Sequence, residues 1–321
     1  MLSEYERVRR WRYVWLLDVD KETSRLWFDM DESDRYNDPG RPVMQQLPNG
    51  QWVMRQKKDE IYFRGSGATP QGDRPFLDLR NLETGKSTRL FRCDPERYES
   101  VVAFAGEGDK FIVRSESPTD VPNYYLATSG KKVKAAEGEA TRQMDLVPVT
   151  NFEDPTPELR QIEKRLVQYE REDGVPLSFQ LLLPPGYQEG TALPTVIYAY
   201  PLEYASASTA GQVRGSTRRF MRIRGSSHLF FLLRGYAVLD QTAMPMVGDA
   251  ETTYNTFVPQ LVADAEAAVA KAVELGIADP DRIGVIGHSH GGLMVANLLA
   301  HTDLFKAGIA RSGSYNKTTQ P

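Results

Sequence analysis

The chain is poor in the side chains that build disulfides and metal sites. Cys93 is its only cysteine, which excludes an internal disulfide and a cysteine-based metal cluster and predicts a buried thiol. Its four histidines lack the spacing of metal ligands, and no HExxH motif occurs. Phosphate-binding glycine loops and dinucleotide fingerprints are also missing. We therefore expect neither a metal ion nor a cofactor.

Strong charge asymmetry and long apolar runs are missing as well. The net charge is −4, from 39 Lys and Arg against 43 Asp and Glu, so no basic surface for nucleic acid is expected. No run approaches the roughly 18 apolar residues of a membrane span, and residues 1–7 are too charged for a signal peptide. As it stands, the chain is expected in the cytoplasm without a membrane partner. The compartment of its parent protein stays open.

What is present describes a globular protein with room for two domains. In residues 1–158, three segments share a strand–turn–strand pattern, and their turn threonines lie 61 and 44 positions apart, a loose repeat of propeller-blade size. The repeat alone leaves a generic antiparallel sheet equally open. Residues 1–158 would make about three blades, whereas closed propellers have roughly four to eight, so we expect further blades upstream. The segments are residues 14–28, 76–91 and 124–133, with turns at Thr23, residues 83–85 and residues 128–130.

Residues 159–321 change to alternating strands and helices, which predicts a parallel sheet covered on both faces. Residues 148–160 are the expected linker between the two halves. The expected strands are residues 165–169, 177–183, 195–200, 236–240, 282–286 and 307–310, with a turn at 279–281 before the fifth. The expected helix at residues 260–275 has an apolar stripe made of Val262, Ala265, Val269 and Val273.

The pentapeptide Gly287-His288-Ser289-His290-Gly291 is the strongest functional motif. G-x-S-x-G marks a nucleophile elbow, where a serine lies on a tight turn between a strand and a helix. The pattern alone is weak, because chance produces it in roughly one chain in ten of this size. Here a predicted buried strand precedes it, and residues 292–301 predict a helix directly after it. That setting favours an elbow over an ordinary strand-to-helix turn.

Several stretches together resemble the prolyl oligopeptidase family of serine peptidases, most closely its glutamyl endopeptidase branch. The resemblance covers nearly the whole chain and implies an incomplete α/β-hydrolase domain at residues 159–321, preceded by the last blades of an all-β propeller at residues 1–158. It thus favours propeller blades over the generic sheet, in a fragment truncated at both ends. The matching stretches are residues 38–40 (DPG), 116–125 (ESPTDVPNYY), 173–179 (DGVPLSF), 182–187 (LLPPGY), 198–204 (YAYPLEY), 209–213 (TAGQV), 235–240 (GYAVLD), 279–284 (DPDRIG), the elbow, and 308–313 (GIARSG).

The motif and the resemblance assign three site residues. Ser289 is the expected nucleophile, and the backbone N–H of His290 is the expected first donor of the oxyanion hole. The resemblance implies that the hydroxyl of Tyr200 is the second donor. Tyr198 and Tyr204 are neighbouring competitors for that role, and Tyr200 could also be a packing residue at the end of its strand.

The base and the acid of a catalytic triad are not found in the sequence. His288 and His290 flank the serine on so tight a turn that neither ring should reach its Oγ, and packing or substrate contact is the expectation for His290. His301 lies three turns along the predicted helix, and His228 is expected to be structural. Asp303 is the only carboxylate after Ser289. Because hydrolases of this fold place the acid and then the histidine after the serine, we expect the chain to end before both and to be inactive by itself.

The sequence therefore predicts a serine-type peptidase that acts through an acyl-enzyme on Ser289, with a peptide or protein as substrate. An esterase on the same fold and a non-catalytic binding fragment are the alternatives. A glutamate preference would need a cation near the site, and an arginine-rich loop follows Tyr204. The strand at residues 307–310 would be an exposed apolar edge, which predicts self-association. The arginines of the loop are Arg214, Arg218, Arg219, Arg222 and Arg224.

Overall fold

The chain forms two compact units in the computed structural model, which describes residues 1–106, 110–134 and 140–315. The α/β unit contains Met1–Asp34, Glu158–Gln212 and the chain from Met221 onward. The all-β unit contains Arg35–Pro157 and Val213–Phe220. The units change between Pro157 and Glu158, next to the predicted boundary, but residues 1–34 group with the α/β unit. The predicted division into domains at residues 158 and 159 stays a prediction.

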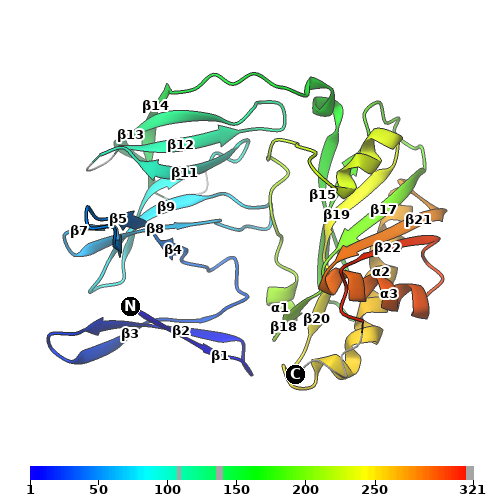
Figure 1. The fold of residues 1–321 in the computed structure, drawn as a ribbon, viewed down its shortest axis with the longest axis horizontal. Helices are drawn as coiled ribbons and strands as arrows, with labels where there is room; N and C mark the ends of the chain where they lie inside the picture. The colour runs from blue at the N-terminus through cyan, green and yellow to red at the C-terminus, as the bar shows by residue number, and fades with distance from the viewer. Residues whose placement is uncertain (107–109, 135–139, 316–321) are drawn as a thin grey trace. The chain divides into compact units, whose positions relative to one another are not determined.

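A six-stranded sheet forms the centre of the α/β unit, in the order β15-β16-β19-β17-β21-β22 (Figure 1). β15 and β16 form an antiparallel hairpin, β16 and β19 are antiparallel, and the other neighbours are parallel. Each of the six predicted strands is confirmed. They are β15 (Glu163–Glu170), β16 (Pro176–Leu183), β17 (Leu193–Ala199), β19 (Ala237–Thr242), β21 (Ala278–His288) and β22 (Ala307–Arg311).

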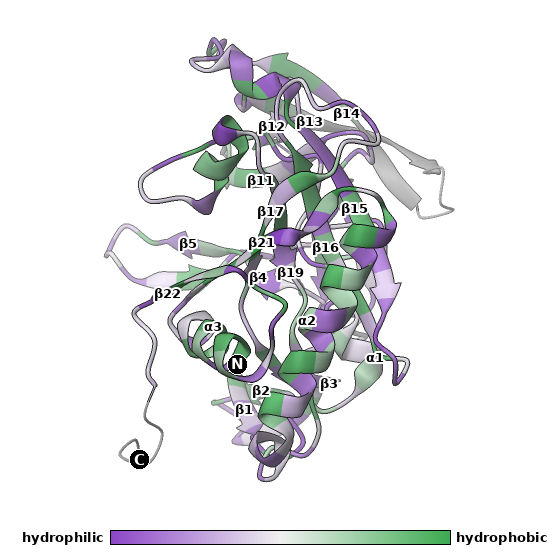
Figure 2. Ribbon diagram, turned by 90° about the vertical axis from the view of Figure 1, so that its right-hand side faces the viewer, coloured by the Kyte–Doolittle hydropathy of each residue, from purple (hydrophilic) through white to green (hydrophobic). Residues whose placement is uncertain are grey.

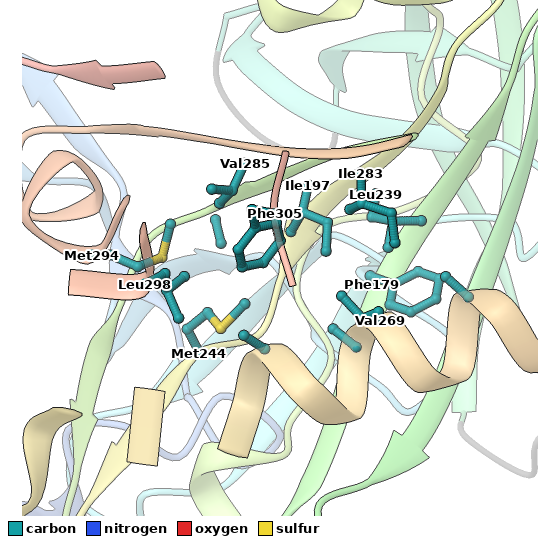
Figure 3. Packing of buried hydrophobic residues seen from close by; sticks show 14 of the residues in the cluster. Phe179, Ile197, Leu239, Met244, Val269, Ile283, Val285, Met294, Leu298 and Phe305 are labelled. Atoms are coloured by element: carbon teal, nitrogen blue, oxygen red, sulfur yellow. The ribbon is translucent and has the colours of Figure 1, made fainter. Parts of the chain in front are cut away.

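Two helices, α2 (Phe257–Glu274) and α3 (His290–His301), pack against this sheet and enclose the main hydrophobic core. Figure 3 shows Phe179, Ile197 and Leu239 from the strands facing Val269 of α2. Seven of the eight residues of β16 are buried, including the polar Ser178 and Gln180, because the two faces of the strand pack into different clusters. This core fixes the ends of the strands and therefore the position of the turn that follows β21.

The apolar stripe of α2 differs from the prediction. Val273 is exposed and Val262 is only half-buried, whereas Ala265 and Val269 are buried as expected. The buried face instead includes Asp264, whose side chain is fully buried and accepts a hydrogen bond from Arg171 Nη1 at 2.9 Å. The polar residue on the core side shifts the apparent hydrophobic periodicity, and Figure 2 shows apolar and polar segments interleaved along α2.

A second correction concerns β21. Residues 279–281, expected as a turn before the strand, lie inside β21. The pairing with β17 shifts there, from Leu193 opposite Ala278 to Thr195 opposite Ile283. The Asp–Pro–Asp sequence thus forms an irregularity within the strand, where extra residues are accommodated without ending the pairing.

An antiparallel meander of β1 (Leu2–Glu6), β2 (Trp11–Asp18) and β3 (Thr23–Asp31) opens the chain. The hairpin predicted around Thr23 is confirmed, with Thr23 as the first residue of β3. The shorter elements of the chain include the parallel pair β18 (Leu202–Tyr204) and β20 (Pro245–Val247), α1 (Ala207–Ala210), and the 3₁₀ helices η1 (Pro157–Gln161), η2 (His228–Arg234) and η3 (Thr253–Thr256).

The all-β unit consists of antiparallel sheets around a core of its own. The predicted hairpin at residues 76–91 is confirmed, whereas the turn expected at residues 128–130 is wrong, because β13 continues through it with a register shift against β14. Cys93 is fully buried, as expected, and its burial raises the pKa of the thiol to about 12. The strands are β4 (Arg41–Pro42), β5 (Met44–Gln46), β6 (Trp52–Met54), β7 (Gln56–Lys57), β8 (Glu60–Gly65), β9 (Phe76–Asn81), β10 (Ser87–Arg92), β11 (Tyr98–Phe104), β12 (Lys110–Glu116), β13 (Asn123–Lys134) and β14 (Ala140–Pro148).

Within the described ranges, no helix combines the length and the apolar character needed to cross a membrane.

Candidate active site

Ser289 occupies a strained turn between β21 and α3. Its backbone has φ 57° and ψ −118°, a region that residues other than glycine rarely adopt. Three hydrogen bonds hold it there: its N–H donates to Arg311 O at 2.9 Å, and its carbonyl accepts from Gly292 at 2.9 Å and Leu293 at 3.3 Å. Strain of this kind persists only where the surroundings enforce it, and it is concentrated at functional sites. The side chain of Ser289 is exposed.

The motif glycines are required by close backbone approaches. A Cβ on Gly287 would lie 2.0 Å from Gly291 O, and one on Gly291 would lie 2.8 Å from Ala199 O. Neither carbonyl can move without breaking the turn or the end of β17. The sequence G-x-S-x-G therefore serves to bring the start of α3 against β17, which leaves the serine at the carboxyl end of the sheet.

Tyr200 is the tyrosine that lies beside the elbow. It follows β17 directly, it is exposed, and its ring centroid is 6.0 Å from that of His290. Tyr198 instead stacks on His228, with the ring centroids 3.8 Å apart and the planes 6° apart. Tyr204 is buried in a different cluster. Of the three tyrosines weighed from the sequence, the structure brings Tyr200 next to the residue that follows Ser289.

The backbone N–H of His290 opens α3. The N–H groups of a first helical turn point away from the helix body, and the helix dipole adds a partial positive charge there. An oxyanion formed at Ser289 would lie near this end of the helix. Roles for Ser289, His290 and Tyr200 in catalysis stay predictions; the structure supplies their arrangement.

Two of the four histidines have partners that do not suit a general base. The ring of His290 packs among Tyr200, Tyr254 and Phe257, with the latter two centroids at 6.4 and 5.5 Å. His228 Nε2 is 2.8 Å from Asp240 Oδ1 beneath the ring of Tyr198, which agrees with the structural role expected for it. His301 is the last residue of α3, and His288 is exposed at the end of β21.

The arginine-rich loop is divided between the two units. Arg218 pairs with Glu96 at 2.9 Å and Arg219 with Glu116 at 3.8 Å, all within the all-β unit. Arg222 and Arg224 are exposed residues of the α/β unit. Arg224 lines a cavity together with Gly287 and His288, which directly precede Ser289.

Arg10 is a cation that the sequence did not reveal. Its Nη2 donates to Glu203 Oε2 at 2.8 Å and its Nη1 to Gly248 O at 3.3 Å. Glu203 also hydrogen-bonds Tyr254, and burial, together with this carboxylate, raises the pKa of Tyr254 to about 12. The only signal in the sequence is an arginine in a turn, 193 residues from its partner.

Comparisons with known proteins agree on one family. The model of a family described as the prolyl oligopeptidase family matches residues 254–320, which include α2, the elbow and α3. A probable chloroplastic glutamyl endopeptidase of Oryza sativa subsp. japonica is 40% identical over 330 residues, covering 96% of this chain and 34% of the relative. A protein of the same name from Arabidopsis thaliana is 39% identical over 342 residues, covering 99% of this chain and 34% of the relative.

Solved structures show the same fold. Dipeptidyl peptidase 4 of Porphyromonas gingivalis is similar with a TM-score of 0.53 at 13% identity, over 97% of this chain and 46% of that chain. The fold is that of propeller blades followed by an α/β-hydrolase sheet. The chain spans about a third of the length of the curated relatives that it matches.

Proposed function

Since the chain belongs to the prolyl oligopeptidase family of serine peptidases, we propose that it carries the nucleophile and the oxyanion hole of a peptidase site. The observation that carries this proposal is the strained backbone of Ser289, at φ 57° between β21 and α3. That strain serves no packing purpose at an exposed side chain, whereas it presents Oγ at the carboxyl end of the sheet.

In the proposed reaction, Ser289 Oγ attacks the carbonyl carbon of a peptide bond while a base removes its proton. The oxyanion of the tetrahedral intermediate accepts hydrogen bonds from His290 N–H and from the hydroxyl of Tyr200. The C–N bond then breaks, the amine leaves with the proton, and the acyl group remains as an ester on Ser289. Water hydrolyses this ester and restores the serine.

We propose that the base and its acid are not among the 321 residues of this chain. The ring of His290 packs among aromatic side chains and His228 is hydrogen-bonded to Asp240, so both rings already have other partners. A serine without a base retains only the residual rate that the oxyanion hole and binding provide. The isolated chain is therefore expected to show little peptidase turnover.

The proposal is tested in a chimaera in which this chain replaces the aligned third of the rice relative. The chimaera should hydrolyse a fluorogenic glutamyl peptide, and Ser289→Ala should lower kcat by about 10⁴-fold or more. The isolated chain should remain near the level of that variant. A folded chimaera that keeps its activity after Ser289→Ala would contradict the role of the serine. Rapid turnover by the isolated chain would contradict the proposal that this chain does not supply the base.

The role of Tyr200 is tested with a matched tyrosine. Tyr200→Phe in the chimaera should lower kcat roughly 100-fold, the usual effect of losing one oxyanion donor. Tyr198→Phe removes a hydroxyl two residues earlier, on β17, and should have little effect, because the ring of Tyr198 stacks on His228. Equal effects of the two substitutions would assign the second donor to another group.

Membership of the family supports a substrate class, whereas it does not determine the cellular compartment. We propose a peptide or protein substrate cleaved at a glutamyl residue, because the two relatives described above are named probable glutamyl endopeptidases. Their names also place them in the chloroplast. The cytoplasmic location expected from the sequence stays a prediction, which fractionation of the source cells and immunoblotting would test.

A further inference from the structure

We propose that Arg10 binds the side-chain carboxylate of the substrate glutamate, with Glu203 and Tyr254 holding its guanidinium in position. The inference rests on the peptidase function proposed above and assigns its specificity to one residue. Arg10 lies between β1 and β2, far in sequence from every motif of the site.

Arg10 is a buried cation with hydrogen-bonding capacity to spare. Its side chain is 6% exposed, and its backbone adopts φ 52°, which turns it inward from the tight turn before β2. A guanidinium has five N–H donors, and those of Arg10 make two bonds, to Glu203 and to Gly248 O. Among the described residues, the other donors have no partner. The Nε of Arg10 is not closed off from solvent, so this donor remains available to a ligand.

Side-chain contacts lead from Arg10 to the elbow. The carboxylate of Glu203 accepts from Arg10 and hydrogen-bonds Tyr254. The ring of Tyr254 stacks on Phe257 at 5.6 Å and lies 6.4 Å from the ring of His290. His290 directly follows Ser289. Each of these residues belongs to the α/β unit, so the proposed ligand site and the nucleophile share one framework.

A carboxylate is the ligand that this geometry favours. The planar fork of arginine matches the two oxygens of a carboxylate, and one guanidinium can bridge two carboxylates along different edges. Glu203 occupies one edge and fixes the orientation of the fork. The side chain of Glu203 is 35% exposed, so Glu203 itself could bind a cationic group of the substrate. The experiment below distinguishes this alternative from binding of a carboxylate by Arg10.

The test measures peptide binding to the 321-residue chain by fluorescence anisotropy. Three labelled peptides, acetylated and amidated, differ only in a central Glu, Gln or Lys. The Glu peptide should bind about tenfold tighter than the Gln peptide, and Arg10→Gln should abolish that difference. Arg9→Gln is the matched control, because Arg9 is the exposed neighbour that contacts Tyr13 and Glu6; it should leave the preference unchanged. Circular dichroism and thermal melting establish that each variant is folded.

A second variant keeps the test decisive if Arg10→Gln does not fold. Glu203→Gln removes the competing negative charge, so it should tighten binding of the Glu peptide. If the chain preferred the Lys peptide and Glu203→Gln removed that preference, Glu203 would be a site for a cation and the inference would be overturned. Equal binding of the Glu and Gln peptides would overturn it. Binding to none of the peptides would also overturn it, whereas the peptidase function is judged separately by the Ser289→Ala chimaera.

Discussion

The two edges of the six-stranded sheet are built in opposite ways. At one edge, β15 carries Glu163, Lys164, Arg165 and Glu170, and Arg165 bonds both Glu163 and Glu189. At the other edge, β22 is uncharged from Ala307 to Ala310, and each of its five residues is exposed. No described strand pairs with the outer side of β22. One edge thus carries the charges that discourage further pairing, and the other lacks them.

The difference shows that burial depends on neighbours more than on strand composition. β16 and β22 are both mainly apolar, yet the first is nearly fully buried, whereas each residue of the second is exposed. The β15 edge is also anchored from within, because Arg171, just after the strand, reaches Asp264 on α2. The β22 edge is held by its pairing with β21 and by Gly308, where a Cβ would lie 2.6 Å from Leu299 Cδ1 of α3. The following predictions test this contrast.

The largest effect is expected at the anchored edge. Asp264→Ala should lower the free energy of unfolding by about 3–5 kcal/mol, because it leaves the buried guanidinium of Arg171 without its buried partner. Asp173→Ala is the control: Asp173 bonds the same guanidinium, but its side chain is 58% exposed, so the loss should be at most about 1 kcal/mol. Urea denaturation measures both, and equal losses would contradict an anchor inside the core.

A smaller, pH-dependent effect is expected from the same carboxyl group. Burial raises the pKa of Asp264 well above its ordinary value of 3.8. The folded state then holds a proton that the unfolded state releases, so the free energy of unfolding should fall as pH rises from about 4 through the folded pKa. Asp264→Asn keeps an acceptor for Arg171 and removes the titration. Relative to this variant, the unsubstituted chain should lose stability as pH rises; a parallel pair of pH profiles would contradict the shifted pKa.

The smallest effect on stability is expected at the uncharged edge. Ile309→Lys should change the free energy of unfolding by less than about 0.5 kcal/mol, since the Ile309 side chain is half-exposed. It should nevertheless reduce the self-association that we propose for β22, because a lysine on an edge strand opposes pairing with a second chain. Val19→Lys, at an exposed apolar position away from this edge, should leave self-association unchanged. Sedimentation velocity is the measurement, and a monomeric unsubstituted chain would refute the proposal.

The elements that the sequence predicted correctly are those determined by near neighbours. The strand, Ser289 and helix α3 follow from glycines that contact each other across four residues. Tyr200 lies beside the elbow because the length of β17 places it there. Local periodicity also located β15, β16, β19 and β22. In each case a short segment contains the reason for its own conformation.

The features that the sequence did not predict depend on distant partners. Asp264 is buried in α2 because Arg171, 93 residues away, pairs with it, and hydrophobic periodicity alone expects an apolar residue there. Arg10 is ordered by Glu203, 193 residues away. The irregularity at residues 279–281 depends on pairing with β17, and the strand at residues 128–130 on pairing with β14. Turn-forming sequences become strand when a neighbouring strand satisfies their backbone groups.

The α/β unit is made of segments that are far apart in the sequence, and this has a consequence for synthesis on the ribosome. Met1–Asp34 is synthesised before the rest of its unit, which begins at Glu158, after the whole of Arg35–Pro157. At the usual speed of translation this delay is on the order of 10 s. During that time the β1–β3 meander, including Arg10, has no access to Glu203. A nascent chain therefore carries the β1–β3 meander without the partner of Arg10 until Glu203 has been synthesised, so the α/β unit can be completed only after the intervening all-β segment.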